Sequence, residues 1–375
     1  MPCPYRVKSK NVFYCGKRIP LECKISICPF GPRIWLILVK GDMNKDRCWH
    51  VIENKYTQLG IDEAIEKCKA EGGYVIKSMT FKSKTFFRLK KNEKKKDTFE
   101  RALDLTTFFD LRKIEDGKNV KIAIVDSGVS EGQDIQAISI RGSTLDLEEH
   151  GSHIVQILKE LLPLADLTMI KVPGEVFADY MLLNALKKAE ELRPHAINLS
   201  IQSETPSAGD DPVSIYLNYL ADKGIITCVA AGNGGPRPLS VGAPGAAKNV
   251  LAIGGVNTSG HVLSWSSRGP TLDGRVKPDL SAPGQFVFGD YYLKGTSFAA
   301  PWATAMAGVL NRDLKHVKLA MRILAMSTSP FPSYILSKKA PAFLRTVKMM
   351  IDPRCIGGYG ILNAVQAHEW MKEII

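Results

Sequence analysis

Short apolar runs alternate with amphipathic stretches through the later and larger part of the chain. Apolar runs of about four to eight residues predict buried strands, and apolar positions that recur about every 3.6 residues predict helices. We predict strands at 120–125, 167–172, 195–201 and 224–231, and helices at 152–162, 179–192 and 296–310. Strands that alternate with helices of this length are typical of a parallel sheet covered on both faces. The pattern therefore predicts an α/β fold with a doubly wound, mainly parallel sheet.

The first hundred residues carry a weaker pattern. Residues 1–30 show no clear periodicity, whereas 34–39 is typical of a buried strand. Residues 61–70 predict a helix, because their apolar positions share one face and a Gly-Gly pair follows. Residues 74–89 alternate apolar and polar positions like a strand or hairpin. We therefore predict a small α+β module at 31–97.

Charge divides the chain in the same way. The whole sequence has 50 Lys+Arg and 38 Asp+Glu, a formal net charge of +12, and its first hundred residues hold 22 of the basic and 11 of the acidic residues. Six of the eight cysteines also lie in the first 70 residues. The predicted organisation is a basic, cysteine-containing segment at 1–30, the module at 31–97 with a lysine-rich linker at 90–97, and a nearly neutral body at 105–370.

Composition excludes several classes of protein. With 45% hydrophobic and 23% charged residues, the chain is neither intrinsically disordered, nor collagen-like, nor a coiled coil. The apolar run 34–39 is far shorter than the roughly 20 residues that a membrane-spanning helix needs. Basic residues interrupt 1–21 and leave no apolar stretch between them, which argues against a secretory signal. We therefore expect no membrane partner and a cytoplasmic location, where thiols stay reduced.

The cysteines near the N-terminus have no assigned role. The spacing Cys15-x7-Cys23-x4-Cys28 lacks the C-x2-C knuckles of common zinc sites, and Cys3 adds no such pair. We expect these cysteines to be free, partly buried thiols, and a metal site or disulfides are the alternatives. The lysine run 90–96 has no aromatic residues between its lysines, which argues against nucleic acid as a partner.

Four polar residues stand at the ends of predicted elements. Asp126 follows the first strand of the body, at the edge where open α/β sheets form their sites. His150 directly precedes a helix, and Ser297 lies at the start of another. Asn233 follows the strand 224–231 in a loop rich in glycine. These are candidate catalytic residues.

The residue types suit nucleophilic catalysis. A serine hydroxyl is a weak nucleophile and needs an imidazole base beside it. The imidazole needs a buried carboxylate that fixes its tautomer and stabilises its cationic form. A developing oxyanion needs donors, which here would be the backbone N–H of Ser297, aided by the helix dipole, and the amide of Asn233.

Longer segments around these residues resemble the signature segments of the subtilisin-like serine proteases, the subtilase family. They appear in the family's order Asp, His, Ser and are Asp126-Ser127-Gly128, His150-Gly151-Ser152-His153-Ile154 and Gly295-Thr296-Ser297-Phe298-Ala299-Ala300-Pro301. Supporting segments lie at 198–200, 230–234, 241–255, 265–270, 277–284 and 358–364. The resemblance covers roughly residues 105–370 and implies a subtilisin-like fold.

The resemblance also implies a role for each matched residue. Ser297 would be the nucleophile, His150 the general base and acid, and Asp126 the orienting carboxylate. Asn233 would donate a hydrogen bond to the oxyanion. Peptide substrates would pair with an edge strand at Ser200, Ile201 and Gln202, while Ala231 and Gly232 would wall the pocket for the residue before the scissile bond. No cofactor is required for this chemistry, and structural calcium is left undecided.

The chain departs from the family pattern in three places. Gln202 stands where the family usually has glycine, and its bulk could narrow the cleft. Glu148 and Glu149 precede His150, and their charge would raise the pKa of that histidine. The segment between Asp126 and His150 is short, which suggests a trimmed loop and a lost calcium site.

Two functions from different classes remain. The first is a serine endopeptidase restrained by its own N-terminal region, which resembles in outline the inhibitory propeptides of subtilases and would be removed by self-cleavage between 90 and 107. The alternative is a protease-like scaffold that acts as a binding module, with a basic arm for nucleic acid or acidic partners. A lipase or esterase is a remote third reading, because the chain lacks a G-x-S-x-G elbow and its nucleophile does not precede its acid and histidine.

Overall fold

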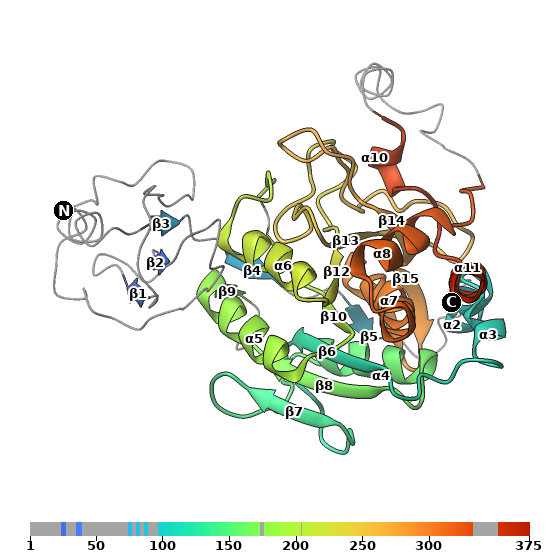
Figure 1. The fold of residues 1–375 in the computed structure, drawn as a ribbon, viewed down its shortest axis with the longest axis horizontal. Helices are drawn as coiled ribbons and strands as arrows, with labels where there is room; N and C mark the ends of the chain where they lie inside the picture. Colours follow the sequence, from blue (N-terminus) through green and yellow to red (C-terminus); the bar gives the residue numbers. More distant parts are fainter. Residues whose placement is uncertain are drawn as a thin grey trace.

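The computed structural model describes residues 24–27, 35–39, 74–76, 80–82, 86–88, 97–172, 176–203, 205–332 and 352–375. A seven-stranded parallel sheet forms the centre of the body, and helices cover both of its faces (Figure 1). The predicted α/β fold with a doubly wound, mainly parallel sheet is therefore confirmed.

The strand order of this sheet shows where the winding reverses. The strands lie in the order β14 (Leu280–Pro283), β13 (Leu251–Val256), β12 (Ile226–Ala230), β10 (Ala196–Leu199), β6 (Lys121–Asp126), β8 (Asp166–Lys171) and β7 (Gln136–Ser139). The chain enters at β6, passes to the edge strand β7, comes back to β8 beside β6, and then crosses to the other side of β6 at β10. In open α/β sheets such a reversal leaves a crevice at the carboxyl ends of the two strands, where sites form.

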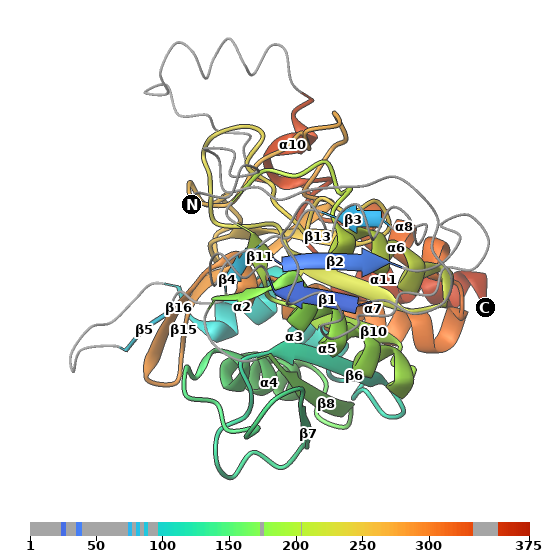
Figure 2. The same ribbon diagram turned by 90° about the vertical axis from the view of Figure 1, so that its left-hand side faces the viewer.

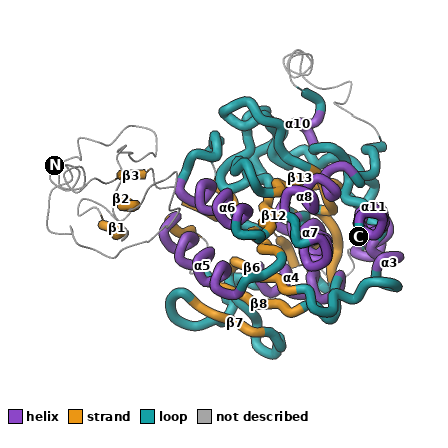
Figure 3. Tube along the Cα trace, viewed as in Figure 1, coloured by secondary structure: helices purple, strands orange, loops and turns teal. Residues whose placement is uncertain are grey.

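Alternating side chains of β6 explain why both faces are covered. Ile122 and Ile124 belong to the core cluster that includes helices α4 (His150–Leu161) and α7 (Ala300–Leu314). Ala123 and Val125 belong to the other large cluster, with α5 (Asp179–Leu192) and α6 (Pro212–Asp222). Successive side chains of a strand point to opposite faces of the sheet. A strand with consecutive apolar residues must therefore be covered by other elements on both faces. Figure 3 shows these two helical layers on either side of the strands.

Four further helices extend the layer that contains α7. They are α2 (Phe99–Leu105), α3 (Phe108–Leu111), α8 (Val317–Met326) and α11 (Ala364–Ile374), and the short α10 (Arg354–Gly357) precedes the last of them. In the described part of the chain, no helix combines the length and the apolar character needed to cross a membrane.

Most predicted elements of the body are present. The strands predicted at 120–125, 167–172 and 224–231 correspond to β6, β8 and β12 within two residues, and the helix predicted at 179–192 has the bounds of α5. The strand predicted at 195–201 is different, because it ends at Leu199 and a second short strand, β11 (Gln202–Ser203), follows it. The helix predicted at 296–310 begins as a 3-10 turn and continues to Leu314.

The described strands nearest the N-terminus form a small antiparallel sheet of their own. It has the order β1 (Lys24–Ile27), β2 (Trp35–Val39) and β3 (Tyr74–Ile76), so the strand predicted at 34–39 is present as β2. The predicted helix at 61–70 and the candidate cysteines lie outside the described residues.

The strand or hairpin predicted at 74–89 corresponds to extended backbone, but its described residues do not pair with one another as a hairpin. Its residues instead contribute strands to three different sheets: β3, β4 (Thr80–Lys82) and β5 (Phe86–Arg88). Strand β4 lies between β11 and β9 (Val176–Ala178), whereas β5 pairs with β16 (Tyr291–Lys294) at the edge of the hairpin that β16 forms with β15 (Gln285–Phe288). Figure 2 shows both strands against the body. The alternation of apolar and polar residues predicted extended backbone here, but it did not predict the strands with which this backbone pairs.

The body begins earlier in the sequence than residue 105. Asp97 accepts hydrogen bonds from the backbone N–H and the hydroxyl of Thr258, at 3.3 and 2.6 Å. Phe99 is buried, with its ring 5.7 Å from that of Phe286 and 5.3 Å from that of Trp302. Residues 97–105 are therefore part of the packed body.

This packing predicts a large loss of stability when Phe99 is shortened. Phe99→Ala should lower the free energy of unfolding by about 3–5 kcal/mol, because it leaves a cavity among aromatic rings. Phe109→Ala is the matched control, since the Phe109 side chain is 53% exposed and should cost less than about 1 kcal/mol. Urea unfolding followed by fluorescence measures both. Equal midpoints for the two variants would contradict the assignment of residues 97–105 to the core.

Candidate active site

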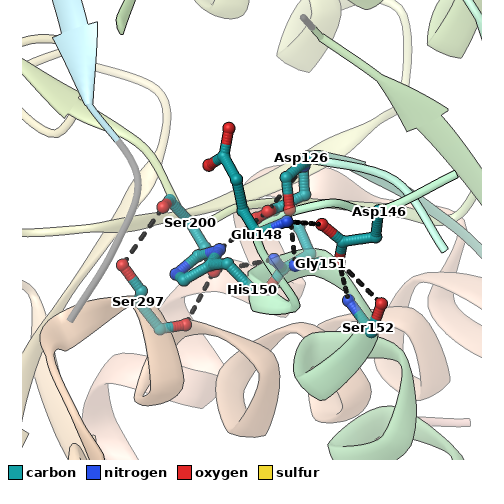
Figure 4. Close-up of polar contacts among 10 residues, drawn as sticks. Asp126, Asp146, Glu148, His150, Gly151, Ser152, Ser200 and Ser297 are labelled. Atoms are coloured by element: carbon teal, nitrogen blue, oxygen red, sulfur yellow. Dashed lines mark hydrogen bonds and ion pairs between the residues drawn. The ribbon is translucent and has the colours of Figure 1, made fainter. Parts of the chain in front are cut away.

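A buried hydrogen-bonded pair of side chains lies at the carboxyl end of β6. Asp126 is the last residue of β6, and His150 is the first residue of α4. Their side chains are fully buried, and Nδ1 of His150 is 2.7 Å from Oδ1 of Asp126. Figure 4 shows the imidazole with the Asp126 carboxylate on one side and the Ser297 side chain on the other. Since the carboxylate accepts at Nδ1, the proton lies there and Nε2 is available as a base.

The start of α4 is held in place by groups before it. Asp146 accepts hydrogen bonds from the backbone N–H and hydroxyl of Ser152, at 2.8 and 2.6 Å. The hydroxyl of Ser127 accepts from the N–H of Gly151 at 2.8 Å. A Cβ at Gly151 would lie 2.6 Å from the carbonyl oxygen of Gly128, so only glycine allows this approach. These contacts fix the backbone that carries His150.

Ser297 lies in the 3-10 turn η1 (Thr296–Phe298), which leads into α7. Its hydroxyl donates to the backbone carbonyl of Ser200 at 3.1 Å. Among the described residues, Nε2 of His150 is buried and has no hydrogen-bond partner. The structure therefore brings the serine beside the histidine without the hydrogen bond between them, an arrangement common before a substrate binds.

A chain of buried hydrogen bonds fixes Ser200 against Ser297. The Ser200 hydroxyl donates to the backbone carbonyl of Ser297 at 2.6 Å and accepts from the side-chain amide of Asn198 at 2.9 Å. Thr304, on α7, donates to the Oδ1 atom of Asn198 at 3.0 Å. The end of β10 and the start of α7 are thus tied together beside the serine.

Asn233 follows β12 and is oriented by the residue before the serine. Its Oδ1 accepts from the backbone N–H of Thr296 at 3.0 Å and from the Thr296 hydroxyl at 3.1 Å. Because a backbone N–H can only donate, these bonds identify the oxygen and leave Nδ2 as the outward donor. A Cβ built on Gly295 would lie 3.6 Å from that Nδ2. The amide donor therefore lies beside the backbone that leads to Ser297.

The side chain of Gln202 reaches from β11 to the loop that follows β12. Its Oε1 accepts from the backbone N–H of Asn233 at 2.7 Å. A Cβ built on Gly232, whose φ is +115°, would lie 2.5 Å from that oxygen and 2.6 Å from the hydroxyl of Ser267. The Gln202 amide therefore fills space that a shorter residue would leave open.

Ile201 and Ala231, two further candidate substrate-binding residues, have buried side chains and could contact a substrate only through their backbone atoms. Ile201 is fully buried in the core cluster of α5 and α6, so its side chain does not face the crevice. Ala231 is also fully buried, and its N–H donates to the carbonyl of Ile253 on β13 at 3.0 Å.

Charge around His150 favours its protonated form. Burial alone would lower the pKa of His150, but the charge and the hydrogen bond of Asp126 outweigh it and hold that pKa above its usual value. Asp146 and Glu148 act in the same direction. The raised pKa was expected from the acidic residues before the histidine; Glu148 contributes, but Asp126 is the stronger cause.

Two positioning residues were missed from the sequence. Asp146 lies four residues before His150, where nothing in the sequence distinguishes its carboxylate from those of Glu148 and Glu149. Thr296 belongs to the segment around Ser297, yet only its contact with Asn233 reveals what it does. Within the described ranges, no three His, Cys, Asp or Glu side chains gather in a group that could hold a metal ion.

The sheet and the Asp-His-Ser arrangement define the class of the protein as a subtilisin-like α/β protein. The comparison with protein families agrees, since residues 117–333 match the subtilase family, Peptidase_S8. This match spans more than half of the chain. The chain belongs to the subtilase family.

Individual relatives are more distant. The serine protease AprX of Bacillus subtilis is 33% identical over 135 residues, which are 28% of this chain and 30% of AprX. Subtilisin E of Bacillus subtilis is 27% identical over 218 residues, which are 52% of this chain and 56% of subtilisin E. The chain thus spans about half the length of these relatives, or less.

Solved structures share the fold at low sequence identity. A lanthipeptide protease has a TM-score of 0.55 at 20% identity, over 72% of this chain and 94% of that one. A protease from Pseudoalteromonas arctica has a TM-score of 0.56 at 17% identity, over the same shares of the two chains. These similarities support the fold.

The acidic surroundings of His150 predict how its titration responds to a change of charge. Glu148→Gln removes one of the charges that raise the pKa of His150, so the imidazole should lose its proton at lower pH than in the wild type. The titration of the His150 ring, followed by NMR, measures this shift. Glu191→Gln on the exposed surface of α5 is the control and should leave the titration unchanged. A Glu148→Gln curve identical to the wild-type curve would contradict the electrostatic account.

Proposed function

We propose that this protein is a serine endopeptidase that hydrolyses peptide bonds through Ser297, His150 and Asp126. The observation that carries the proposal is the buried pair of Asp126 and His150, with an available Nε2 beside the Ser297 side chain. Family membership supports the same chemistry. Peptides and proteins are the proposed substrates.

The first half of the reaction would form an acyl-enzyme. A turn of the Ser297 side chain away from the carbonyl of Ser200 would bring its hydroxyl to Nε2 of His150, which takes the proton as Oγ attacks the carbonyl carbon. Asn233 Nδ2 and the Ser297 N–H would stabilise the oxyanion. The carbon–nitrogen bond then breaks, and His150 returns its proton to the departing amine.

The second half would release the other fragment. Water gives a proton to Nε2 and attacks the ester carbon, and the same donors stabilise the second oxyanion. The ester bond then breaks, and His150 returns the proton to Ser297. The raised pKa of His150 makes the cation formed in both halves easier to hold, but it also means that the free base becomes scarce as the pH falls.

Substrate would bind as an added strand. Ser200, Ile201 and Gln202 supply the edge backbone, an arrangement that reads main chain rather than side chain. Ala231 and Gly232 wall the pocket for the residue before the scissile bond. The N-terminal region is proposed as the inhibitor of this cleft. A cytoplasmic site of action stays a prediction from the sequence.

Removal of the proposed nucleophile should lower peptide hydrolysis more than removal of the proposed oxyanion donor. Ser297→Ala should abolish hydrolysis of a casein-derived fluorogenic peptide. Asn233→Ala should lower kcat by about 100- to 1000-fold, a figure measured for one such donor in subtilisin and carried over here. Circular dichroism checks that both variants are folded. Turnover by Ser297→Ala at the wild-type rate would overturn the proposal.

A fluorophosphonate probe separates the enzyme from the binding-module alternative. Labelling at Ser297 that is lost in His150→Ala supports the peptidase, because only an activated serine reacts with the probe. Salt-sensitive binding to DNA by a protein that never labels would favour a basic binding module instead. The comparisons give that alternative no support.

Gln202 is proposed to limit the size of the residue accepted before the scissile bond. Gln202→Gly removes the amide that lies against Gly232, so kcat/KM for substrates with a large side chain there should rise about tenfold relative to those with alanine. Gln202→Glu is the matched control, because its carboxylate can still accept from the N–H of Asn233. A peptide library profiled with all three proteins measures the ratio. An unchanged cleavage profile in Gln202→Gly would contradict the proposal that Gln202 limits the size of this pocket.

A further inference from the structure

Ser200 contacts Ser297 at two points. Its backbone carbonyl accepts from the Ser297 hydroxyl at 3.1 Å, and its own hydroxyl donates to the Ser297 carbonyl at 2.6 Å (Figure 4). Ser200 is fully buried, and Ser297 is only 6% exposed. A change in the orientation of Ser200 would therefore disturb the proposed nucleophile and the backbone that carries it at the same time.

The Ser297 carbonyl needs a side-chain donor because of the residue four positions later. In an α-helix each carbonyl accepts from the N–H of the fourth residue on, and for Ser297 that residue is Pro301, which has no N–H. A buried carbonyl without a donor costs free energy. The Ser200 hydroxyl supplies the hydrogen bond that Pro301 cannot.

The direction of every proton in the buried network follows from that bond. Because the Ser200 hydroxyl gives its one proton to Ser297, its oxygen must accept from the Asn198 side chain, 2.9 Å away. The Asn198 atom at that position is therefore Nδ2. Its Oδ1 atom accepts in turn from the Thr304 hydroxyl at 3.0 Å. Hydrogen bonds that run in one direction polarise one another, so each bond strengthens the next.

Within the described residues, Thr304 is the donor that satisfies the Oδ1 atom of the fully buried Asn198. Its hydroxyl also lies 3.0 Å from the carbonyl of Ala300, but in the helical pattern that carbonyl already faces the backbone N–H of Thr304. Burial raises the pKa of the Cys228 thiol to about 12, so this thiol, which is hydrogen-bonded to Thr304, stays protonated and can donate. The Thr304 proton is therefore available to Asn198.

We propose that Thr304 is a positioning residue for the reaction. Through Asn198 and Ser200 it holds the Ser297 backbone in the orientation from which the hydroxyl attacks and the N–H stabilises the oxyanion. The inference rests on the proposed peptidase function. Thr304 lies in the second turn of α7 and has no exposed surface, so it acts on the reaction only through these neighbours.

Removal of the Thr304 hydroxyl should slow the chemical steps without weakening substrate binding. In Thr304→Val the Oδ1 atom of Asn198 loses its donor and the amide is free to rotate, so kcat should fall about tenfold while KM stays unchanged. Thr304→Ser keeps the hydroxyl and should have the wild-type kcat. Thr227→Val is the matched control, because Thr227 on β12 is also buried and its hydroxyl has no hydrogen-bond partner in the described part of the chain.

Hydrolysis of the fluorogenic peptide by the purified full chain measures kcat and KM. Each rate is divided by the amount of protein that a fluorophosphonate labels after long incubation, so that a partly folded sample is not mistaken for a slow enzyme. If too little Thr304→Val folds, Thr304→Ala removes the same donor without adding a methyl group.

A double variant tests the route through Ser200. Ser200→Ala interrupts the network between Asn198 and Ser297 and should itself lower kcat. Adding Thr304→Val to Ser200→Ala should then lower kcat no further, because both changes break the same series of hydrogen bonds.

Each contrary outcome has a definite meaning. A wild-type kcat in both Thr304→Val and Thr304→Ala overturns the inference. A loss in Thr304→Ser or Thr227→Val as large as that in Thr304→Val also overturns it, and so do losses that add in the double variant. In all these outcomes the wild type is still a peptidase, so the proposed function stands. A wild type that neither hydrolyses the peptide nor reacts with the fluorophosphonate overturns the peptidase, and this inference with it.

Discussion

The buried contact between Asp126 and His150 is the interaction on which the rest of the site depends. A carboxylate removed from water is stable only when a charge or hydrogen bonds compensate it, and here the 2.7 Å contact with Nδ1 does so. The contact joins the carboxyl end of β6 to the first residue of α4, so it lasts only while those two backbone ends stay together. The Ser127 hydroxyl and the missing Cβ of Gly151 keep them together. The winding of the sheet, the start of the helix and the basicity of Nε2 are thus parts of one arrangement.

The sequence was sufficient for the fold of the body, and it also singled out four catalytic candidates, whose roles stay proposals. Strands such as β6 and β8 are buried on both faces, so their apolar runs are continuous and can be recognised without knowing their neighbours. Asp126, His150 and Ser297 lie at the ends of such elements within segments of unusual composition. The structure brings His150 into contact with Asp126 and beside the Ser297 side chain, and it orients the amide of Asn233.

What the sequence could not supply depends on contacts between distant residues. An alternating stretch predicts extended backbone, but strands of three residues such as β4 and β5 contain no information about the edge with which they pair. In the same way, glutamine at 202 could be recognised as unusual, whereas its bond to the N–H of Asn233 depends on a strand and a loop that meet only after folding. Asp146 is one of several acidic residues before His150, and its fixed position relative to Ser152 distinguishes it from the others.

The position of β4 between β11 and β9 has a consequence for any peptide that would add a strand at the same edge. Strand β4 belongs to the same chain as that edge, and a covalently linked partner corresponds to an effective concentration in the millimolar range. A peptide that binds at this edge of β11 would have to displace β4. Because the effective concentration of β4 does not change when the protein is diluted, dilution would not make that displacement easier.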